Sequence, residues 1–196
     1  MLRVTEEGVL PPAAKKPGVI SAVALVGFMG AGKTTVGRAL AERLGWRFAD
    51  IDQLIEASER RTILQIFADD GEVYFRELER KTLAQAFALP DSTPLVLALG
   101  GGAFVSSSVR KLLAELGIAS VWLDAPVDEL FRRCEQPDVV RPLRRDPQQF
   151  AQLHEQRLSS YRQADLHVVT IGKEISSIVN EVIQGLALGP VSRSSE

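Results

Sequence analysis

Short apolar runs alternate with helically periodic segments along most of this chain. Residues 22–26 and 95–99 are continuous apolar runs, and residues 46–49, 118–123 and 166–170 are further strand candidates. Runs of this length suit strands that are buried on both faces of a sheet. Strands that alternate with helices usually form parallel sheets joined by crossover helices. The pattern therefore predicts an α/β fold, a three-layer α/β/α sandwich around a mainly parallel five-stranded sheet.

The segments between the strand candidates carry apolar residues every three or four positions, as the buried face of a helix does. The residues predicted to share a buried helix face are Val36, Leu40 and Leu44; Phe75, Leu78, Thr82 and Ala86; and Val109, Leu112, Leu113 and Leu116. Two further helices are predicted to contain Phe150, Leu153, Arg157 and Tyr161, and Ile175, Ile178, Val179 and Val182. Gly45 is placed to end the first helix in a left-handed conformation. Thr62 and Gln65 have the spacing of a capping box, which predicts a short helix after them.

Composition indicates one domain. The chain has 196 residues, of which 45% are hydrophobic, and this is enough for one core but little for two. We expect the domain to span residues 19–187, between a disordered extension at residues 1–18 and a disordered tail at residues 188–196. Residues 135–147 are charged, contain proline and lack a period, which predicts a mobile loop.

Charge and cysteine content exclude several classes of partner. A formal net charge of −2 provides no broad basic field, so we expect no nucleic-acid partner. The single cysteine, Cys134, can form neither an intrachain disulfide nor a Cys-rich metal site, which fits a reducing cytoplasm. The apolar runs are too short to cross a bilayer, so no membrane association is expected. No feature requires an oligomer, and we expect a monomer.

Residues 27–34, GFMGAGKT, match the pattern of a phosphate-binding loop. The glycines let backbone N–H groups point at phosphate oxygens, and the helix that begins near Lys33 adds its positive dipole end. Lys33 is expected to reach the β- and γ-phosphates of a nucleotide, and the Thr34 hydroxyl to ligate Mg²⁺. The alternative is a glycine-rich turn that matches by coincidence. The apolar strand before the loop and the helix after it favour nucleotide binding.

The loop recognises phosphate only, so it leaves the class of nucleotide-binding protein open. The guanine reader of common GTPases, Asn-Lys-x-Asp, is missing, because the only asparagine, Asn180, is followed by Glu181. Asp124, at the end of a strand candidate, resembles the metal-binding aspartate of motor and transporter ATPases. Its position before Pro126 favours a helix cap instead.

Two carboxylates, Asp50 and Asp52, follow the second strand candidate. Residues at i and i+2 of an extended segment project to the same side, so both side chains can face the γ-phosphate. Asp50 is suited to the water shell of Mg²⁺, and Asp52 to accepting a hydrogen bond from an attacking hydroxyl. A solvated turn is the alternative interpretation of such a pair.

Six motifs occur in a fixed order along the chain. They are the phosphate loop, FADIDQLIE at residues 48–56, GE and FRELE within residues 71–79, three glycines at residues 100–102, RPL at residues 141–143, and Arg157 with Tyr161, Ala164 and Asp165. From about residue 19 to about residue 182 the chain thereby resembles the shikimate kinase family. The resemblance implies a P-loop kinase architecture like that of nucleoside monophosphate kinases. It also implies ATP-dependent phosphorylation of the 3-hydroxyl of shikimate, a step of aromatic amino-acid and chorismate biosynthesis.

The resemblance implies roles for individual residues. Those expected to bind shikimate are Asp52, Arg76, Gly100, Gly101, Gly102 and Arg157. Those expected to bind ATP are Gly30, Ala31, Gly32, Lys33, Thr34, Thr35, Arg133 and, from a lid formed by the loop at residues 135–147, Arg141. Thr34 and Asp50 match the Mg²⁺ side, while Lys33, Asp52 and Arg141 match the catalytic set. Two arginines suit a substrate carboxylate, because a guanidinium donates paired hydrogen bonds.

Alternatives remain for the arginines and for the activity. Arg76 lies among several glutamates of its own helix and could belong to a surface ion-pair network, and Arg157 could pair with Glu155 or Asp165. A gluconate-type kinase would share the loop and sheet, although it has less need of two carboxylate-binding arginines. A non-catalytic sensor module would be expected to have lost Lys33 or Asp52, but both residues are present. Such a module also usually carries an effector domain, and we expect no room for one in the residues before the predicted domain.

Overall fold

The computed structural model describes residues 20–88, 93–134 and 146–190 of the chain. Its five strands are β1 (Ala22–Val26), β2 (Arg47–Asp50), β3 (Leu95–Ala98), β4 (Ala119–Asp124) and β5 (Leu166–Val169). They form one sheet in the order β2-β3-β1-β4-β5, and every neighbouring pair is parallel. The predicted α/β fold with a five-stranded parallel sheet is confirmed.

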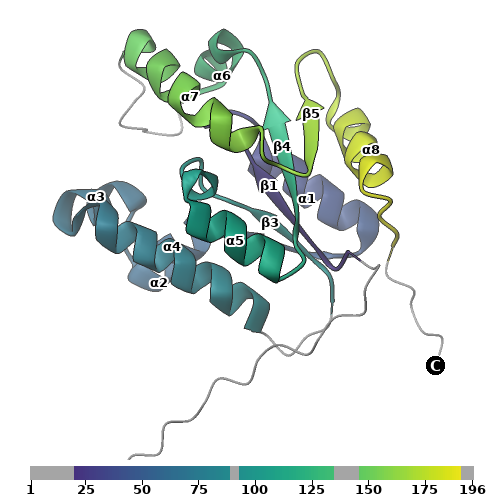
Figure 1. Ribbon diagram of the computed structural model, residues 1–196, viewed down its shortest axis with the longest axis horizontal. Coiled ribbons are helices and arrows are strands. Elements are labelled where there is room, and N and C mark those ends of the chain that lie inside the picture. Colours follow the sequence, from purple (N-terminus) through teal and green to yellow (C-terminus); the bar gives the residue numbers. More distant parts are fainter. Residues whose placement is uncertain (1–19, 89–92, 135–145, 191–196) are drawn as a thin grey trace, which may run out of the picture.

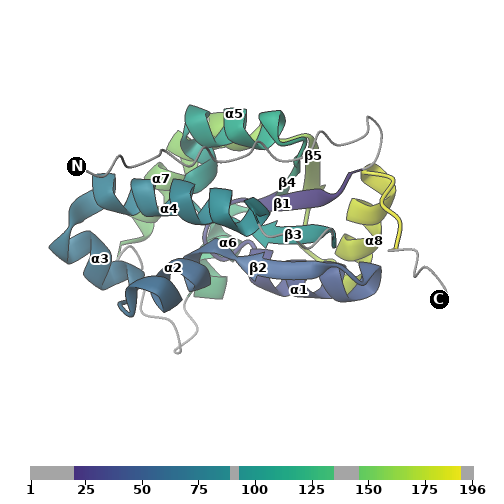
Figure 2. The ribbon, with the colours of Figure 1, turned by 90° about the horizontal axis from the view of Figure 1, so that it is seen from below.

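Helices cover both faces of the sheet (Figure 1). α1 (Lys33–Leu44) and α8 (Ile175–Gly185) contact each other on one face, and α4 (Gly71–Ala88) and α5 (Ser107–Glu115) lie on the other face (Figure 2). This arrangement confirms the three-layer sandwich. No helix in the described ranges is both long and apolar enough to cross a membrane.

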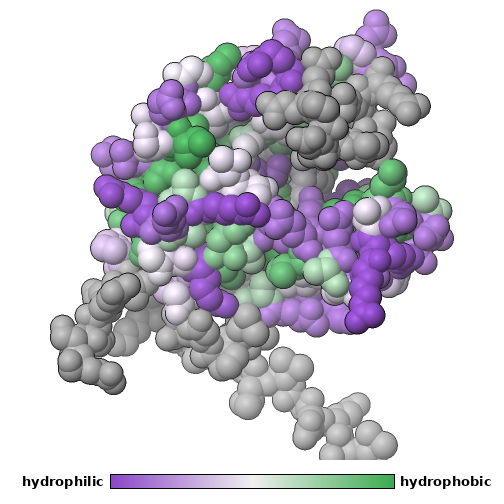
Figure 3. All heavy atoms as spheres, turned by 180° about the vertical axis from the view of Figure 1, so that it is seen from behind, coloured by the Kyte–Doolittle hydropathy of each residue, from purple (hydrophilic) through white to green (hydrophobic). Residues whose placement is uncertain are grey.

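The remaining helices form two groups at the ends of the strands. α2 (Ile51–Glu59) and α3 (Ile63–Asp69) pack against α4 after β2, while α6 (Val127–Cys134) and α7 (Pro147–Tyr161) pack together after β4. A short 3₁₀ turn, η1 (Ala103–Val105), connects β3 to α5 and contacts α7. Seen from behind, the surface is hollowed between the two groups of helices, and hydrophilic residues gather beside this hollow (Figure 3).

Local signals in the sequence set several helix ends, and two of these signals were predicted. Gly45 ends α1 with a φ of 67°, in the left-handed region that glycine adopts without strain. Thr62 and Gln65 form the predicted capping box at the start of α3. Asp146 caps α7 by accepting hydrogen bonds from two backbone N–H groups of the first turn. These caps fix where the helices begin and end relative to the sheet.

The buried face of α4 differs from the predicted one. Phe75 and Ala86 are buried as expected, but Leu78 and Thr82 are only half-buried. Glu79 and Leu83 are buried in their place. The pattern of apolar residues could not predict this, because the stripe that faces inward includes a carboxylate. This carboxylate lies in the candidate site described below.

Asp124 does not cap the following helix, so that prediction was wrong. The residue belongs to β4, and α6 begins only at Val127, where the Leu130 N–H donates to the Pro126 carbonyl. The Asp124 carboxylate lies 2.9 Å from His167 Nε2 instead. The predicted second strand also shifts by one residue, because the Trp46 N–H bonds back to the Ala41 carbonyl of α1.

The strand order determines which loops meet. In a parallel sheet the carboxyl ends of all strands lie at one edge, where α/β proteins usually bind ligands. β3 lies between β2 and β1, and its residue Ala98 is in register with both Asp50 and Leu25. The segments that leave these three strands are residues 51–52, residues 99–105 and the phosphate loop. They therefore begin side by side.

Candidate active site

The phosphate loop, residues 27–34, has the backbone geometry that its glycines allow. Gly27, Gly30 and Gly32 have φ values of 139°, 81° and 86°, which residues with a Cβ rarely adopt. A Cβ added at Gly30 would lie 2.6 Å from the Leu130 carbonyl oxygen, so α6 packs directly on this loop. The loop thus follows a buried strand and opens α1, which is the context the motif requires.

The predicted ATP-binding residues of this loop differ in exposure. Lys33 Nζ donates to the carbonyls of Gly27 at 2.9 Å and Phe28 at 3.0 Å, so the ammonium group lies over the loop. Ala31 is buried, and its N–H donates to the Phe28 carbonyl at 3.2 Å. Thr35 is exposed on α1. The Lys33 ammonium group can bind a nucleotide if its hydrogen bonds to the two backbone carbonyls are replaced by hydrogen bonds to phosphate oxygens.

Thr34 and Asp50 meet between α1 and β2. The Thr34 hydroxyl donates to Asp50 Oδ2 at 2.7 Å, and Asp50 Oδ1 accepts from the Asp52 N–H at 3.1 Å. Asp50 therefore caps α2 and is held in one orientation. No cluster of three or more His, Cys, Asp or Glu side chains suited to a metal occurs in the described ranges. Two hard oxygen ligands nevertheless fit Mg²⁺, because this ion usually completes its shell with phosphate oxygens and water.

A second structural unit of the site is the glycine turn, which we define as residues 100–105. A Cβ added at Gly100 would lie 2.6 Å from Asp52 Oδ1 and 2.8 Å from Glu79 Oε1. Both carboxylates thus press against the same glycine. Glu79 is 3% exposed, whereas charged residues are rarely buried unless they have a partner. Glycine is required at this position because any side chain would displace these carboxylates.

Arg76 supplies the partner of Glu79. Its Nη1 lies 2.5 Å from Glu79 Oε2, and its Nη2 lies 3.0 Å from Glu72 Oε1. A Cβ added at Gly102 would lie 2.5 Å from Arg76 Nη2, so the guanidinium group also contacts the glycine turn. The ion pairs with glutamates, considered above as an alternative, are present. They hold Arg76 beside the predicted substrate-binding glycines, so the two interpretations are compatible.

Burial and charge act in opposite directions on this pair. Burial raises the pKa of Glu79, the Arg76 guanidinium lowers it, and the neighbouring Asp52 carboxylate raises it further, so the net shift is upward. Burial lowers the pKa of Arg76, but Glu79 and Glu72 raise it by more. Arg76 therefore remains a cation over a wide pH range, while Glu79 loses its proton less readily than an exposed glutamate.

Arg157 approaches the glycine turn from α7. A Cβ added at Gly101 would lie 3.5 Å from Arg157 Nη1 and 3.6 Å from the Met29 backbone nitrogen of the phosphate loop. The Arg157 guanidinium lies 5.5 Å from the centroid of the Phe28 ring, in a cation–π contact. The predicted alternative of pairing with Asp165 was wrong, because Asp165 accepts hydrogen bonds from Ser120 instead. Gly101 is thus the point where Arg157 and the phosphate loop meet.

The two arginines face one cavity of about 420 Å³, which we call the acceptor pocket. Its charged lining consists of Arg76, Arg157, Glu72 and Glu79, and its apolar lining consists of Val105, Val109 and Leu153. Such a pocket favours a small ligand that combines an anionic group with an apolar ring face. Asp52, Arg76, Arg157 and the three glycines are therefore brought together, as the sequence predicted.

Arg133 lies near the end of α6, the helix that packs on the phosphate loop. Its Nε donates to Glu129 Oε1 at 2.8 Å, and its Nη1 lies 3.4 Å from Thr170 Oγ1 after β5. Hydrogen bonds from Arg132 and Arg133 lower the pKa of Glu129 to about 2. The predicted lid and its residue Arg141 lie outside the described residues, as do the predicted N-terminal extension and most of the C-terminal tail.

Two residues of the site were given no role by the sequence. Glu79 orients Arg76, and its spacing three residues after an arginine on a helix is the signal that could have indicated this. Tyr161 donates its hydroxyl proton to the Gly101 carbonyl at 2.5 Å. Burial raises the pKa of Tyr161 to about 12, against an opposing effect of Arg157, so the hydroxyl stays a donor.

A phosphate-binding loop that faces an acceptor pocket across one glycine defines a small-molecule P-loop kinase. The family model described as shikimate kinase matches residues 29–187. A shikimate kinase of Persephonella marina is 42% identical over 159 residues, which are 81% of this chain and 94% of that protein. The chain belongs to the shikimate kinase family, which confirms the resemblance predicted from the six motifs.

Solved structures agree with this assignment. The structure of a shikimate kinase from Acinetobacter baumannii in complex with shikimate is 36% identical, with a TM-score of 0.76, and the match covers 84% of this chain and 92% of that one. A gluconokinase from Sinorhizobium meliloti is 22% identical with a TM-score of 0.57, over 87% of this chain and 94% of that one. The second likeness shows a shared fold only.

The raised pKa of Glu79 leads to a prediction about stability. Its ordinary pKa is 4.5. A carboxyl group whose pKa is higher in the folded state contributes stability at low pH that is lost as the pH rises through that pKa. We therefore expect the melting temperature of Glu79→Gln to rise relative to that of the wild type as the pH increases from about 4 to about 8.

Thermal unfolding over a series of pH values measures this difference. Glu77→Gln is the matched control, because Glu77 is exposed on the same helix. For the control, the difference from the wild type should change little with pH. A difference for Glu79→Gln that stays constant or reverses would contradict the assigned effect of burial.

Proposed function

We propose that this protein transfers the γ-phosphoryl group of ATP to the 3-hydroxyl of shikimate, giving shikimate 3-phosphate and ADP. The observation that carries the proposal is the position of Gly101. A Cβ there would lie 3.6 Å from a backbone nitrogen of the phosphate loop and 3.5 Å from Arg157 in the acceptor pocket. Donor and acceptor groups bound on the two sides would therefore be close enough to react.

The acceptor pocket supports a carboxylate-bearing substrate. Arg76 and Arg157 both line it, and each can donate hydrogen bonds to a carboxylate oxygen. Glu79 forms an ion pair with Arg76, so the arginine need not be ordered when the substrate binds. Gluconate also carries a carboxylate, but the apolar walls suit a ring better than an extended chain of hydroxyls.

The reacting groups come from the other two segments. Asp52 lies against Gly100 and would hold the attacking hydroxyl by accepting its hydrogen bond. Lys33 would move from the loop carbonyls to the β- and γ-phosphates, where it offsets their charge. Thr34 and Asp50 are the residues that would hold Mg²⁺, which when bound neutralises phosphate charge.

The remaining residues would complete the nucleotide side. Arg133, on α6, extends toward Thr170 after β5, where it would contact the adenine. Arg141 is proposed to approach the phosphates from the lid and to exclude water that would otherwise hydrolyse ATP. Monomeric state, a cytoplasmic location and the absence of nucleic-acid partners stay predictions from the sequence.

An ADP-release assay with several acceptors tests the proposal. We expect rapid turnover with shikimate and little with gluconate or simple polyols, because only shikimate combines a ring carboxylate with a hydroxyl near Asp52. Lys33→Ala is the control for activity from the phosphate loop. Turnover with gluconate alone would support the gluconate-type alternative. ATP binding without turnover on any acceptor would support the sensor module.

Substitution of the two arginines tests the acceptor site. Arg76→Ala and Arg157→Ala should each weaken shikimate binding by about 2 kcal/mol or more, because the carboxylate loses a charge-assisted partner. The KM for shikimate reports this change, and the KM for ATP should change little. Arg132→Ala is the matched control, since this arginine is 69% exposed on α6. Unchanged constants in both variants would reject the assignment of the pocket.

A further inference from the structure

The glycine turn touches every charged group proposed to act on the acceptor. Gly100 lies against Asp52, Gly101 against Arg157, and Gly102 against Arg76. Three successive glycines have no side chains with which to anchor themselves, and glycine loses more conformational freedom on folding than any other residue. The position of the turn therefore depends on bonds made to its backbone by other parts of the protein.

Arg110, on α5, makes one set of these bonds. Its Nη1 donates to the carbonyls of Phe104 and Val105, each at 2.7 Å. The guanidinium group also lies 5.9 Å from the centroid of the buried Phe104 ring. The Val105 N–H in turn donates to the Gly102 carbonyl at 3.2 Å. Arg110 thus holds the C-terminal end of the turn through two adjacent carbonyls.

Tyr161, on α7, holds the middle of the turn. Its hydroxyl donates to the Gly101 carbonyl, and the whole residue is 1% exposed. Its ring stacks on Trp122 of β4, with centroids 6.0 Å apart and an angle of 26° between the planes. Because the ring is packed against the sheet, the hydroxyl ties Gly101 to the rigid part of the fold.

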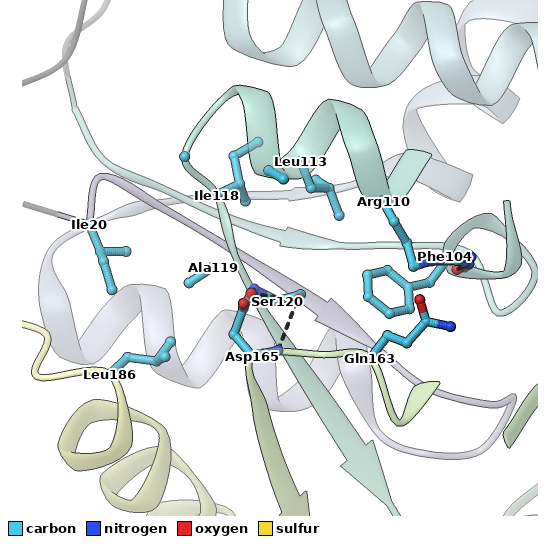
Figure 4. Close-up of a pocket in the computed structure, with 12 residues that line it drawn as sticks. Ile20, Phe104, Arg110, Leu113, Ile118, Ala119, Ser120, Gln163, Asp165 and Leu186 are labelled. Atoms are coloured by element: carbon cyan, nitrogen blue, oxygen red, sulfur yellow. Dashed lines mark hydrogen bonds between the residues drawn. The ribbon is translucent and has the colours of Figure 1, made fainter. Parts of the chain in front are cut away.

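Both side chains act from outside the acceptor pocket. Arg110 runs from α5 toward the backbone beside Phe104, at the edge of a separate hollow of about 560 Å³ (Figure 4). No residue lines both this hollow and the acceptor pocket, and Tyr161 lines neither. Substitution of Arg110 therefore leaves the lining of the acceptor pocket chemically unchanged. Tyr161→Phe also removes the contact between the Tyr161 hydroxyl and Arg157, which lines that pocket.

We propose that Arg110 and Tyr161 are positioning residues that fix the glycine turn and thereby set the affinity for the acceptor. The inference rests on the proposed function. Loss of either bond would let the turn move relative to Asp52, Arg76 and Arg157 together. The phosphate loop lies near the turn at Gly101, but it is anchored by its direct connections to β1 and α1 and by its contact with α6. Nucleotide binding should therefore be affected much less than acceptor binding.

The variants Tyr161→Phe and Arg110→Ala test this inference by kinetics. Each should raise the KM for shikimate about fivefold, as expected for loss of one or two hydrogen bonds, with the KM for ATP within about twofold of the wild type. Arg110→Lys should recover part of the loss, because an ammonium group can still donate to the carbonyls. Tyr74→Phe and Lys111→Ala are matched controls, since they remove an exposed hydroxyl and an exposed charge elsewhere.

Amide hydrogen exchange gives a second readout that needs no substrate. Both variants should accelerate exchange within residues 100–106 and leave the phosphate loop at the wild-type rate. Equal rises in both KM values, or unchanged exchange in the turn, would indicate a general structural role and overturn the inference. A wild type that does not phosphorylate shikimate would reject the proposed function, and the exchange rates would then decide on the positioning role alone.

Discussion

The close contact between the glycine turn and two carboxylates is the constraint on which the rest of the site depends. β3 lies between β2 and β1, so whatever follows β3 must fit between Asp52 and the phosphate loop. Only glycine leaves room for Asp52 Oδ1 and Glu79 Oε1 at the distances observed. The parallel sheet thereby places the phosphate loop and the residues proposed to bind the acceptor beside one backbone segment that has no side chains.

Electrostatics explains why a carboxylate is buried there. Burial of a charge costs free energy unless a partner and hydrogen bonds offset it. Glu79 receives that partner from Arg76 in its own helix, while Asp52 adds repulsion on the other side. In return, Arg76 is oriented before any substrate arrives. Burial of the Glu79 carboxylate therefore lowers the stability of the fold, and its ion pair with Arg76 orders the acceptor pocket.

The sequence alone predicted the architecture, and it predicted which residues would come together beside the phosphate loop, for identifiable reasons. The glycine pattern of residues 27–34 follows from the backbone conformation of a phosphate loop, and β1 and β3 were continuous apolar runs, so these features could be predicted from the sequence. Family motifs located Asp52, Arg76 and Arg157, which the structure places around one turn.

Some features depend on long-range packing and were not accessible in this way. The buried face of α4 includes Glu79, and a hydrophobic pattern cannot indicate a buried charge. Asp124 has the sequence context of a helix cap, but a strand in register with β5 brings it to His167 instead. The bonds that Arg110 and Tyr161 make to the glycine turn likewise join segments that the sequence pattern does not connect.

The most direct measurement is a crystal structure of the protein with shikimate and ADP bound. The shikimate carboxylate should lie within hydrogen-bond distance of Arg76 and Arg157, with a ring hydroxyl directed at Asp52 and the ADP phosphates on the loop of residues 27–34. Shikimate bound elsewhere, or with its carboxylate directed away from both arginines, would contradict the central role of the glycine turn.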